Sequence, residues 1–275
     1  MRKATVPYQG RRIPPLYAVA FIDPGIPKQQ GQEAAVARYP LALVPQDNRR
    51  HFRKWRDDVK ALNPDIVLLA YQMTILETTS PGPGHDVLRG VRNAWRTWPW
   101  GGQIRVEAKR RRVFDPRSSE WKAAFLNACA ATLESYPYDG LFLDQCSVFS
   151  VHHPLKSVRN EMLQHLRETL LELRKRHPNK IFVGNSIYSL PGLNGIMSED
   201  REEHFDEDLI PFDGQWSPPI NLGLVLSANR LDDKVLKRKL HRVCSLGAFF
   251  TATQSYQHVT WSPIYDEVLK IAHGA

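Results

Sequence analysis

The sequence has few cysteines and no long apolar run, and each lack excludes a class of protein. Its 275 residues include only three cysteines, Cys129, Cys146 and Cys244, at spacings that fit neither a disulfide framework nor a zinc site. No run approaches the roughly 20 apolar residues that a membrane-spanning helix needs. No glycine-rich phosphate loop is present. We therefore expect neither a membrane-spanning protein nor a P-loop nucleotide-binding protein.

The chain also lacks a recognisable signal peptide and internal repeats. Its first 12 residues are basic, but Pro14 and Pro15 follow them, and no apolar segment of signal-peptide length is present. We expect a cytoplasmic protein, or one exported by another route. A chain of this length can build one large core. We therefore expect a single domain over residues 1–275.

The charge balance is basic, with 37 Lys and Arg against 29 Asp and Glu and a net charge of +8. This balance favours an anionic partner, such as an acidic glycan or a nucleic acid. Most basic residues fall on helix-like stretches and read as solvated helix faces. Only residues 109–112 form a compact basic cluster.

Short apolar runs alternate with amphipathic segments along the chain. The rhythm predicts a parallel sheet with right-handed crossovers, as in a (β/α)8 TIM barrel. Helices are expected at residues 32–38, 49–62, 121–135, 155–177, 232–245 and 264–273. Strands are expected at residues 16–22, 41–44, 66–70, 104–108, 111–114, 141–144, 181–183, 195–198, 222–226 and 248–252.

The two short runs between 104 and 114 count together as one candidate, which gives about nine candidates for the eight places of a barrel. We expect the extra one within 104–114, or else the first strand. Residues 73–112 are otherwise expected to be irregular, and long irregular segments are usually functional or mobile. Three tryptophans on this segment, Trp95, Trp98 and Trp100, could stack on sugars or bases, or could pack the segment onto the body.

Local signals also predict helix ends. Asp47 or Asn48 could cap the helix at 49–62, whose Phe52, Trp55, Val59 and Leu62 share one face. Asp115 followed by a proline reads as the cap of the next long helix.

Polar residues follow nearly every predicted strand. Since catalysis in parallel α/β barrels takes place at the carboxyl ends of the strands, these residues are candidates for a ligand site. A rim of carboxylates, amides and phenols suits a ligand rich in hydroxyl groups, and no strand-end lysine suggests a Schiff base. The expected substrate-binding residues are Asp23, Gln46, Tyr71, Gln72, Asp115, Asn185, Trp98, Trp216 and Gln254.

Two carboxylates stand out, Asp144 and Glu199, because one predicted strand separates the two strands that they end. Glycoside hydrolysis needs two carboxyl groups, one to attack or activate water and one to protonate the leaving oxygen. An aspartate in a polar position stays ionised, whereas a glutamate with a raised pKa can carry the proton. The alternative is that both only cap helices or hydrogen-bond loops.

Other chemistry is poorly supported. Cys146 lies close to Asp144 in the sequence, but no histidine is clearly placed to activate it as a nucleophile. His152 and His153 are adjacent, without a carboxylate at ligand spacing. We therefore expect no metal site and no cofactor.

The stretch Tyr138-Asp139-Gly140-Leu141-Phe142-Leu143-Asp144 resembles the signature of glycoside hydrolases of the endo-α-1,4-polygalactosaminidase-like type. The block Val113-Phe114-Asp115-Pro116 with Trp121 is similar to the segment that precedes this signature. The runs Val183-Gly184-Asn185 and Ile196-Met197-Ser198-Glu199 are similar to the two strands that follow it. The similarity spans about residues 65–200 and departs from the pattern at Gln145, where asparagine is usual.

This resemblance implies a (β/α)8 barrel and a retaining mechanism. It matches Asp144 to the nucleophile, Glu199 to the acid/base residue and Asn185 to a polar residue near the substrate. The prediction is a glycosidase acting on a polysaccharide or oligosaccharide, with no prediction of oligomeric state. The alternatives are a carbohydrate-binding barrel without catalysis and, less favoured, nucleic-acid binding through residues 109–112 and the tryptophans.

Overall fold

The computed structural model describes part of the chain. Its longest described stretches are residues 32–92, 111–146, 155–185 and 190–199. Shorter described pieces are residues 6–8, 11–13, 18–19, 94–95, 97, 105–106, 220, 222–226, 234 and 249–253.

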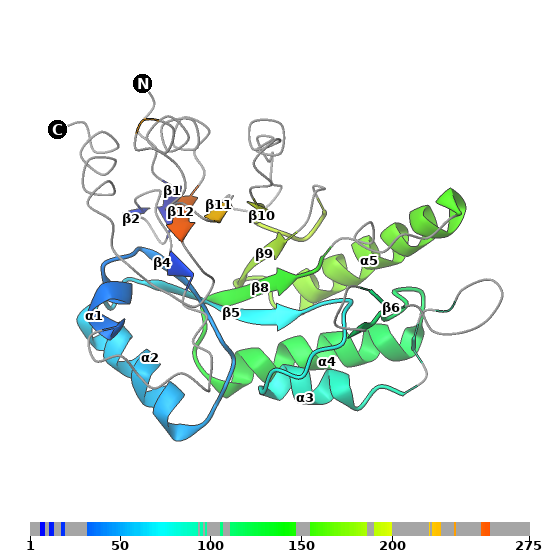
Figure 1. Cartoon of the computed structure of the whole chain (residues 1–275), viewed down its shortest axis with the longest axis horizontal. Helices are drawn as coiled ribbons and strands as arrows, with labels where there is room; N and C mark the ends of the chain where they lie inside the picture. Colours follow the sequence, from blue (N-terminus) through cyan, green and yellow to red (C-terminus); the bar gives the residue numbers. More distant parts are fainter. Residues whose placement is uncertain are drawn as a thin grey trace.

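An eight-stranded parallel sheet forms the centre of the fold (Figure 1). Its strands are hydrogen-bonded in the order in which they occur along the chain. They are β3 (Ala18–Val19), β4 (Leu41–Val44), β5 (Val67–Met73), β8 (Gly140–Asp144), β9 (Ile181–Asn185), β10 (Gly195–Glu199), β11 (Leu222–Leu226) and β12 (Phe249–Thr253). Among the described residues, no pairing joins β3 to β12, the two strands at the ends of this order. The pairings therefore establish a parallel α/β sheet, as in part of a barrel, and do not establish that the barrel closes.

Each strand of this sheet overlaps one of the expected strands. The extra candidate lies outside the sheet, because β6 (Arg105–Val106) and β7 (Arg111–Arg112) pair only with each other, antiparallel, in a small sheet. A second antiparallel pair, β1 (Val6–Tyr8) and β2 (Arg11–Ile13), was not expected.

Four helices begin and end within two residues of the expected bounds. They are α1 (Gln32–Ala37), α2 (Arg50–Leu62), α4 (Ser119–Ser135) and α5 (Lys156–Arg176). Figure 1 shows α2, α3 and α4 together on one side of β5 and β8. Of the helix expected at 232–245, only residue 234 is described, and the helix expected at 264–273 lies outside the described residues.

The segment at 73–112 is less irregular than expected, because it contains helix α3 (Pro83–Arg89) as well as β6 and β7. Proline breaks a helix in its interior but is favoured in its first turn, and Pro83 occupies that place. A run of proline and glycine that reads as a loop therefore starts a helix here. Helix α3 packs along α4 (Figure 1).

The helix ends correct three predictions. Arg49 is the N-cap of α2 and makes no side-chain capping bond, and Asp47 instead accepts hydrogen bonds from Arg49. Ser118, rather than Asp115, caps α4, and its hydroxyl accepts from the amide of Trp121. Leu62 was expected on the buried face of α2 with Phe52, Trp55 and Val59, and those three are buried. Leu62 itself is 60% exposed, because it lies in the last turn of the helix.

Apolar side chains fill both faces of the sheet. On one face, Ala42, Val44, Leu68, Ala70 and Leu141 pack with residues of the helices in a large buried cluster. On the other face, a second cluster contains no helix residue. Its members are Leu41, Leu43, Val67, Leu69, Phe142, Ile181, Val183, Met197, Ile220 and Leu222, with Tyr71 against them. Since side chains alternate along a strand, the sheet is buried on both faces, as a barrel wall requires.

Gly140 permits the close approach of β8 and β9. A Cβ atom at this position would lie 1.8 Å from the carbonyl oxygen of Ile181, closer than any real contact allows. The glycine that precedes the apolar run is therefore needed to pair the two strands that end at Asp144 and Asn185.

Candidate active site

Three of the predicted site residues lie together beyond the second cluster, which contains no residue of the described helices. Tyr71, Asp144 and Asn185 each lie two positions beyond a member of the second cluster, namely Leu69, Phe142 and Val183. Residues two positions apart on a strand share a face. The side chains therefore meet near the carboxyl ends of the adjacent strands β5, β8 and β9.

The carboxylate of Asp144 is held by three neutral donors. Its Oδ1 accepts from Asn185 Nδ2 at 2.9 Å and from the Gln145 amide at 2.8 Å. Its Oδ2 accepts from the hydroxyl of Tyr71. Hydrogen bonds to both oxygens fix the orientation of the carboxylate. Asp144 therefore presents an oriented carboxyl group at the end of β8.

The turn after Asp144 is fixed by the backbone. The backbone of Gln145 has a φ angle of 54°, in the left-handed region that residues other than glycine rarely adopt. The Asp144 carbonyl accepts from the Thr74 amide at 3.0 Å, and the Cys146 amide donates to the Asn185 carbonyl at 3.0 Å. These bonds tie the turn to its neighbours on both sides. The Gln145 amide in this turn donates to Oδ1 of Asp144.

Tyr71 lies between an aromatic ring and a buried histidine. Its ring centroid is 6.1 Å from that of Phe142 and 6.0 Å from that of His85, which it meets edge to face. His85 belongs to α3, is 1% exposed and accepts from the Met73 amide through Nε2 at 3.1 Å. Burial lowers the pKa of His85 to about 4, so the imidazole is neutral at pH 7. His85 was missed because no periodic signal marked α3.

Gln46 and Gln72 lie on the helix-facing side of the sheet. They are 1% and 0% exposed, and Gln46 Nε2 donates to Gln72 Oε1. Both side-chain oxygens lie within hydrogen-bonding distance of the Thr132 hydroxyl of α4. Gln46 also accepts from the Gly84 amide at the start of α3. These two amides join β4 and β5 to α3 and α4. We therefore give them a structural role and leave them out of the site proposed below.

Asp115 lies in an ion-pair cluster between α4 and α5. It binds Arg117 through both carboxylate oxygens, and Arg117 also binds Glu161 of α5 at 2.9 Å. A cavity of about 500 Å³ is lined by Ala94, Trp95, Asp115, Arg117, Ser118, Glu161 and His165. Trp95 stacks on Phe114 with ring centroids 4.4 Å apart, and Arg112 lies 3.9 Å over it. Trp95 therefore packs its segment onto the body.

Cys146 does not have the properties of a nucleophile. It is fully buried, and burial raises the pKa of its thiol to about 12. Cys129 is buried in the core, as expected. In the part of the chain that the structure describes, no group of three or more His, Cys, Asp or Glu residues could hold a metal ion.

The remaining predicted residues fall outside the described side chains. Glu199 is the last residue of β10, and its backbone pairs in register with Leu224. Met197, two positions earlier, pairs with Asn185 of β9. Asp23, Trp98, Trp216 and Gln254, and the pair His152 and His153, lie outside the described residues, as do the basic residues 109 and 110.

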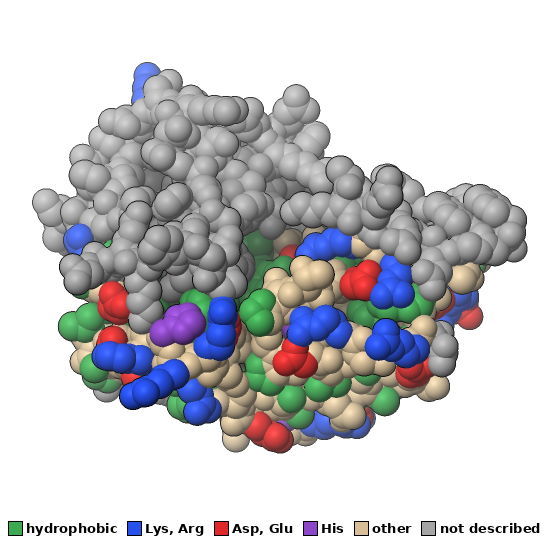
Figure 2. Space-filling view, turned by 60° about the horizontal axis from the view of Figure 1, so that its bottom comes forward, with side chains coloured by type: hydrophobic (Ala, Val, Ile, Leu, Met, Phe, Trp, Pro, Cys, Tyr) green, Lys and Arg blue, Asp and Glu red, His purple; other side chains and the backbone are tan. Residues whose placement is uncertain are grey.

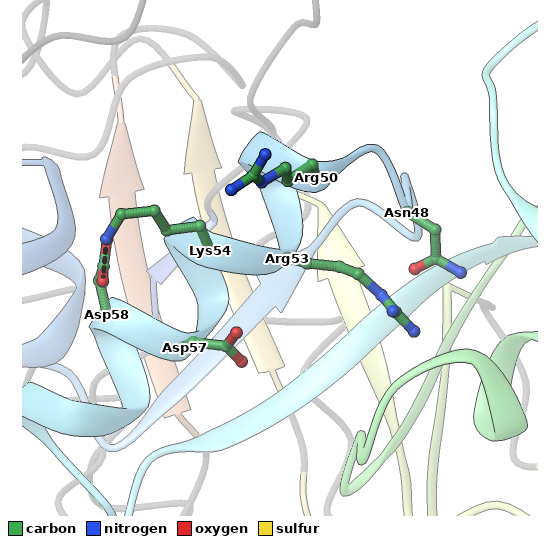
Figure 3. Close-up of a pocket in the computed structure, with 6 residues that line it drawn as sticks. All are labelled: Asn48, Arg50, Arg53, Lys54, Asp57 and Asp58. Carbon is green, nitrogen blue, oxygen red and sulfur yellow. Dashed lines mark hydrogen bonds and ion pairs between the residues drawn. The ribbon is translucent and has the colours of Figure 1, made fainter.

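On the described part of the surface over the helices, the side chains that line a second cavity are mainly charged. A cavity of about 580 Å³ on α2 is lined by Asn48, Arg50, Arg53, Lys54, Asp57 and Asp58, and Lys54 and Asp58 pair within it (Figure 3). Basic and acidic side chains are interspersed on the described part of the face in Figure 2. That face therefore shows scattered charges rather than a basic stripe for nucleic acid. None of the described helices has the length and apolar character needed to traverse a bilayer.

Three solved structures are similar to this one. The glycoside hydrolase domain of PelA from Pseudomonas aeruginosa aligns with a TM-score of 0.58 and 15% identity, over 90% of this chain and 98% of that chain. The noncanonic maltogenic α-amylase AmyB from Thermotoga neapolitana aligns with a TM-score of 0.58 and 12% identity, over 95% of this chain and 76% of that chain. The α-galactosidase AgaA from Geobacillus stearothermophilus aligns with a TM-score of 0.59 and 11% identity, over 95% of this chain and 41% of that chain.

No protein-family model and no curated protein sequence matches the chain. At identities of 11 to 15%, the three structural alignments establish a shared fold. This fold is that of glycoside hydrolase domains.

Proposed function

We propose that this protein is a glycoside hydrolase in which Asp144 and Glu199 are the two catalytic carboxyl groups. The observation that carries the proposal is the oriented carboxylate of Asp144 at the carboxyl end of β8, held by Tyr71, Asn185 and the Gln145 amide. In parallel α/β barrels this end of the sheet is where catalysis takes place. The fold shared with glycoside hydrolase domains is consistent with this chemistry.

The register of the sheet supports pairing Asp144 with Glu199. Only β9 separates β8 from β10. Met197 belongs to the second cluster, and Glu199 follows it by two positions along the strand. By strand parity, the proposal assigns residue 199 to the same face and the same end of the sheet as Asp144. A closed (β/α)8 barrel, with β3 beside β12, belongs to the proposal because it would enclose this face.

The proposed mechanism is retaining. Asp144 attacks the anomeric carbon while Glu199 protonates the leaving oxygen, and Glu199 later removes a proton from the water that releases the sugar. This route needs the carboxyl groups about 5–5.5 Å apart, whereas an inverting enzyme needs about 6.5–9.5 Å. We propose a polysaccharide or oligosaccharide substrate, in line with the motif resemblance to endo-α-1,4-polygalactosaminidase-like enzymes, with Asn185 and the rim of β5 and β8 beside the sugar.

The test is a screen of neutral, acidic and amino-sugar polysaccharides for released reducing ends, run with wild type, Asp144→Asn and Glu199→Gln. We expect each variant to lose at least about 1,000-fold in kcat, because each removes one half of the carboxyl pair. Asp58→Asn is the control, since it removes an exposed carboxylate on α2 that pairs with Lys54. Circular dichroism checks that the folds are unchanged.

Two results would contradict the proposal. One is near-normal turnover by either variant on a glycan that wild type cleaves. The other is glycan binding by wild type with no released ends, which would assign a binding barrel without catalysis. Product stereochemistry, followed by NMR in the first minutes of reaction, separates retention from inversion.

A further inference from the structure

We propose that Tyr71 is the positioning residue for Asp144, and that Oδ2 of Asp144 is the oxygen that reacts. This inference rests on the proposed function and deepens it, since it separates the two oxygens of the carboxylate by role. It also changes the role expected for Tyr71, from a substrate contact to a residue that acts through Asp144.

The two oxygens of Asp144 differ in what holds them. Among the described residues, Oδ1 accepts two hydrogen bonds, and one of them comes from the backbone amide of Gln145. Oδ2 accepts one, from the hydroxyl of Tyr71. A backbone donor in a turn tied on both sides cannot move away during a reaction, whereas a phenolic hydroxyl can rotate. Oδ1 is therefore the anchored oxygen and Oδ2 the exchangeable one.

Tyr71 is well placed to act on Oδ2. It is paired in register with Phe142 on β8, and Asp144 lies two positions further along that strand. Its hydroxyl therefore reaches diagonally across the strand pair to the carboxylate. The ring is confined by Phe142 and by the buried His85. Tyr71 thus fixes the carboxylate plane without carrying a charge.

The reaction changes this hydrogen bond at one oxygen. When Oδ2 donates an electron pair to the anomeric carbon, the bond from that carbon to the leaving oxygen breaks. The leaving oxygen keeps the bonding pair and takes the proton of Glu199. Oδ2 then belongs to an ester and is a much weaker acceptor, so the Tyr71 hydroxyl is released. Water later restores the carboxylate and the hydrogen bond, with its proton passing to Glu199.

The test compares the steady-state kinetics of Tyr71→Phe with those of wild type. The variant keeps the ring and its packing but removes the donor to Oδ2. We expect kcat to fall about 10- to 100-fold, because the carboxylate is no longer held in the orientation from which it attacks. We expect KM to stay within about twofold of the wild-type value, because the hydroxyl acts on Asp144 and not on the sugar.

Two further variants complete the design. Tyr136→Phe is the matched control: its hydroxyl also donates to a carboxylate, Asp57 at 3.0 Å, but it follows α4, outside the site. Its kinetics should equal those of wild type. Asn185→Ala removes a side-chain donor to Oδ1, and it should lower kcat less than Tyr71→Phe does, because the Gln145 amide remains.

The outcomes separate this inference from the proposed function. If wild type cleaves a glycan and Asp144→Asn does not, but Tyr71→Phe keeps the wild-type kcat or loses rate through KM alone, only the positioning role is overturned. A larger loss of kcat in Asn185→Ala than in Tyr71→Phe would overturn the oxygen assignment. If Asp144→Asn stays active, the proposed function itself is wrong. Should Tyr71→Phe not fold, Tyr71→Leu also lacks the hydroxyl and carries the same expectation.

Discussion

At the residue scale, a buried arginine holds the segment between β4 and α2. The guanidinium of Arg56 is 1% exposed and donates to the carbonyls of Pro45 and Asp47 and to the side chain of Asn48. It also lies 4.5 Å over the ring of Tyr136. Burial lowers the pKa of Arg56. The positive charge is thus balanced by carbonyl dipoles and aromatic faces that only this fold brings together.

Replacing Arg56 should destabilise the protein. Arg56→Met keeps an apolar stem but leaves the Pro45 and Asp47 carbonyls without their buried donor, so we expect the free energy of unfolding to fall by about 2 to 4 kcal/mol. Urea denaturation measures the change. Arg50→Gln on the exposed face of the same helix is the control and should shift stability by less than about 0.5 kcal/mol. Equal effects of the two variants would contradict this account.

Side-chain parity separates neighbouring residues that look alike in sequence. Tyr71 and Gln72 are adjacent polar residues near the end of one strand, and both were expected to contact substrate. Tyr71 shares the face of Leu69 and reaches Asp144, whereas Gln72 shares the face of Leu68 and meets the helices. The sequence shows that Tyr71 and Gln72 must face opposite sides of the strand, because successive side chains alternate. It does not show which of the two sides faces the helices. Only packing decides that.

At the element scale, helix α3 is attached to the sheet by polar groups. Gln46 accepts from the Gly84 amide, and His85 accepts from the Met73 amide. Gly84 has no room for a larger residue, since a Cβ atom there would lie 2.3 Å from Gln72 Oε1. Such contacts leave no periodic apolar pattern in the sequence, so α3 could not be predicted from periodicity.

The attachment of α3 should weaken at acid pH. The pKa of His85 is about 4 in the folded protein, below its value of 6.5 when exposed, so the unfolded chain binds the extra proton first. The contribution of neutral His85 to the free energy of unfolding is fully present above pH 6.5. It is lost as the pH falls towards 4, by roughly 3 kcal/mol. Urea denaturation between pH 7 and 4 measures this loss.

His85→Gln provides the control, because glutamine can accept from the Met73 amide but does not titrate. The difference in pH dependence between wild type and this variant isolates His85 from other histidines, including His177, whose pKa is also lowered by burial. Parallel pH profiles for the two proteins would contradict the prediction.

At the scale of the whole molecule, the parallel order of the strands brings together residues far apart in the chain. Tyr71 and Asp144 are 73 positions apart, and Asn185 lies a further 41 positions on. Each reaches the site because all three strands run in the same direction and end at the same edge. The segments that carry these three residues therefore belong to one folded unit.

We therefore predict that the 275-residue chain behaves as a single compact domain. Its radius of gyration should be about 19 Å, the value for a compact chain of this length. Small-angle X-ray scattering measures it, and denaturation should show one transition by fluorescence and by circular dichroism. A clearly larger radius or two separate transitions would indicate two domains.

The sequence by itself determined the strands of the parallel sheet, most of the described helices and the carboxylate at the end of β8. These are local properties, because an apolar run, an amphipathic stripe and a following polar residue are neighbours in the chain. The tertiary structure alone decided which face of each strand meets the helices, that Gln46 and Gln72 are buried, and that Tyr71, Asn185 and the Gln145 amide converge on Asp144. These depend on packing and register between distant segments, which no local pattern encodes.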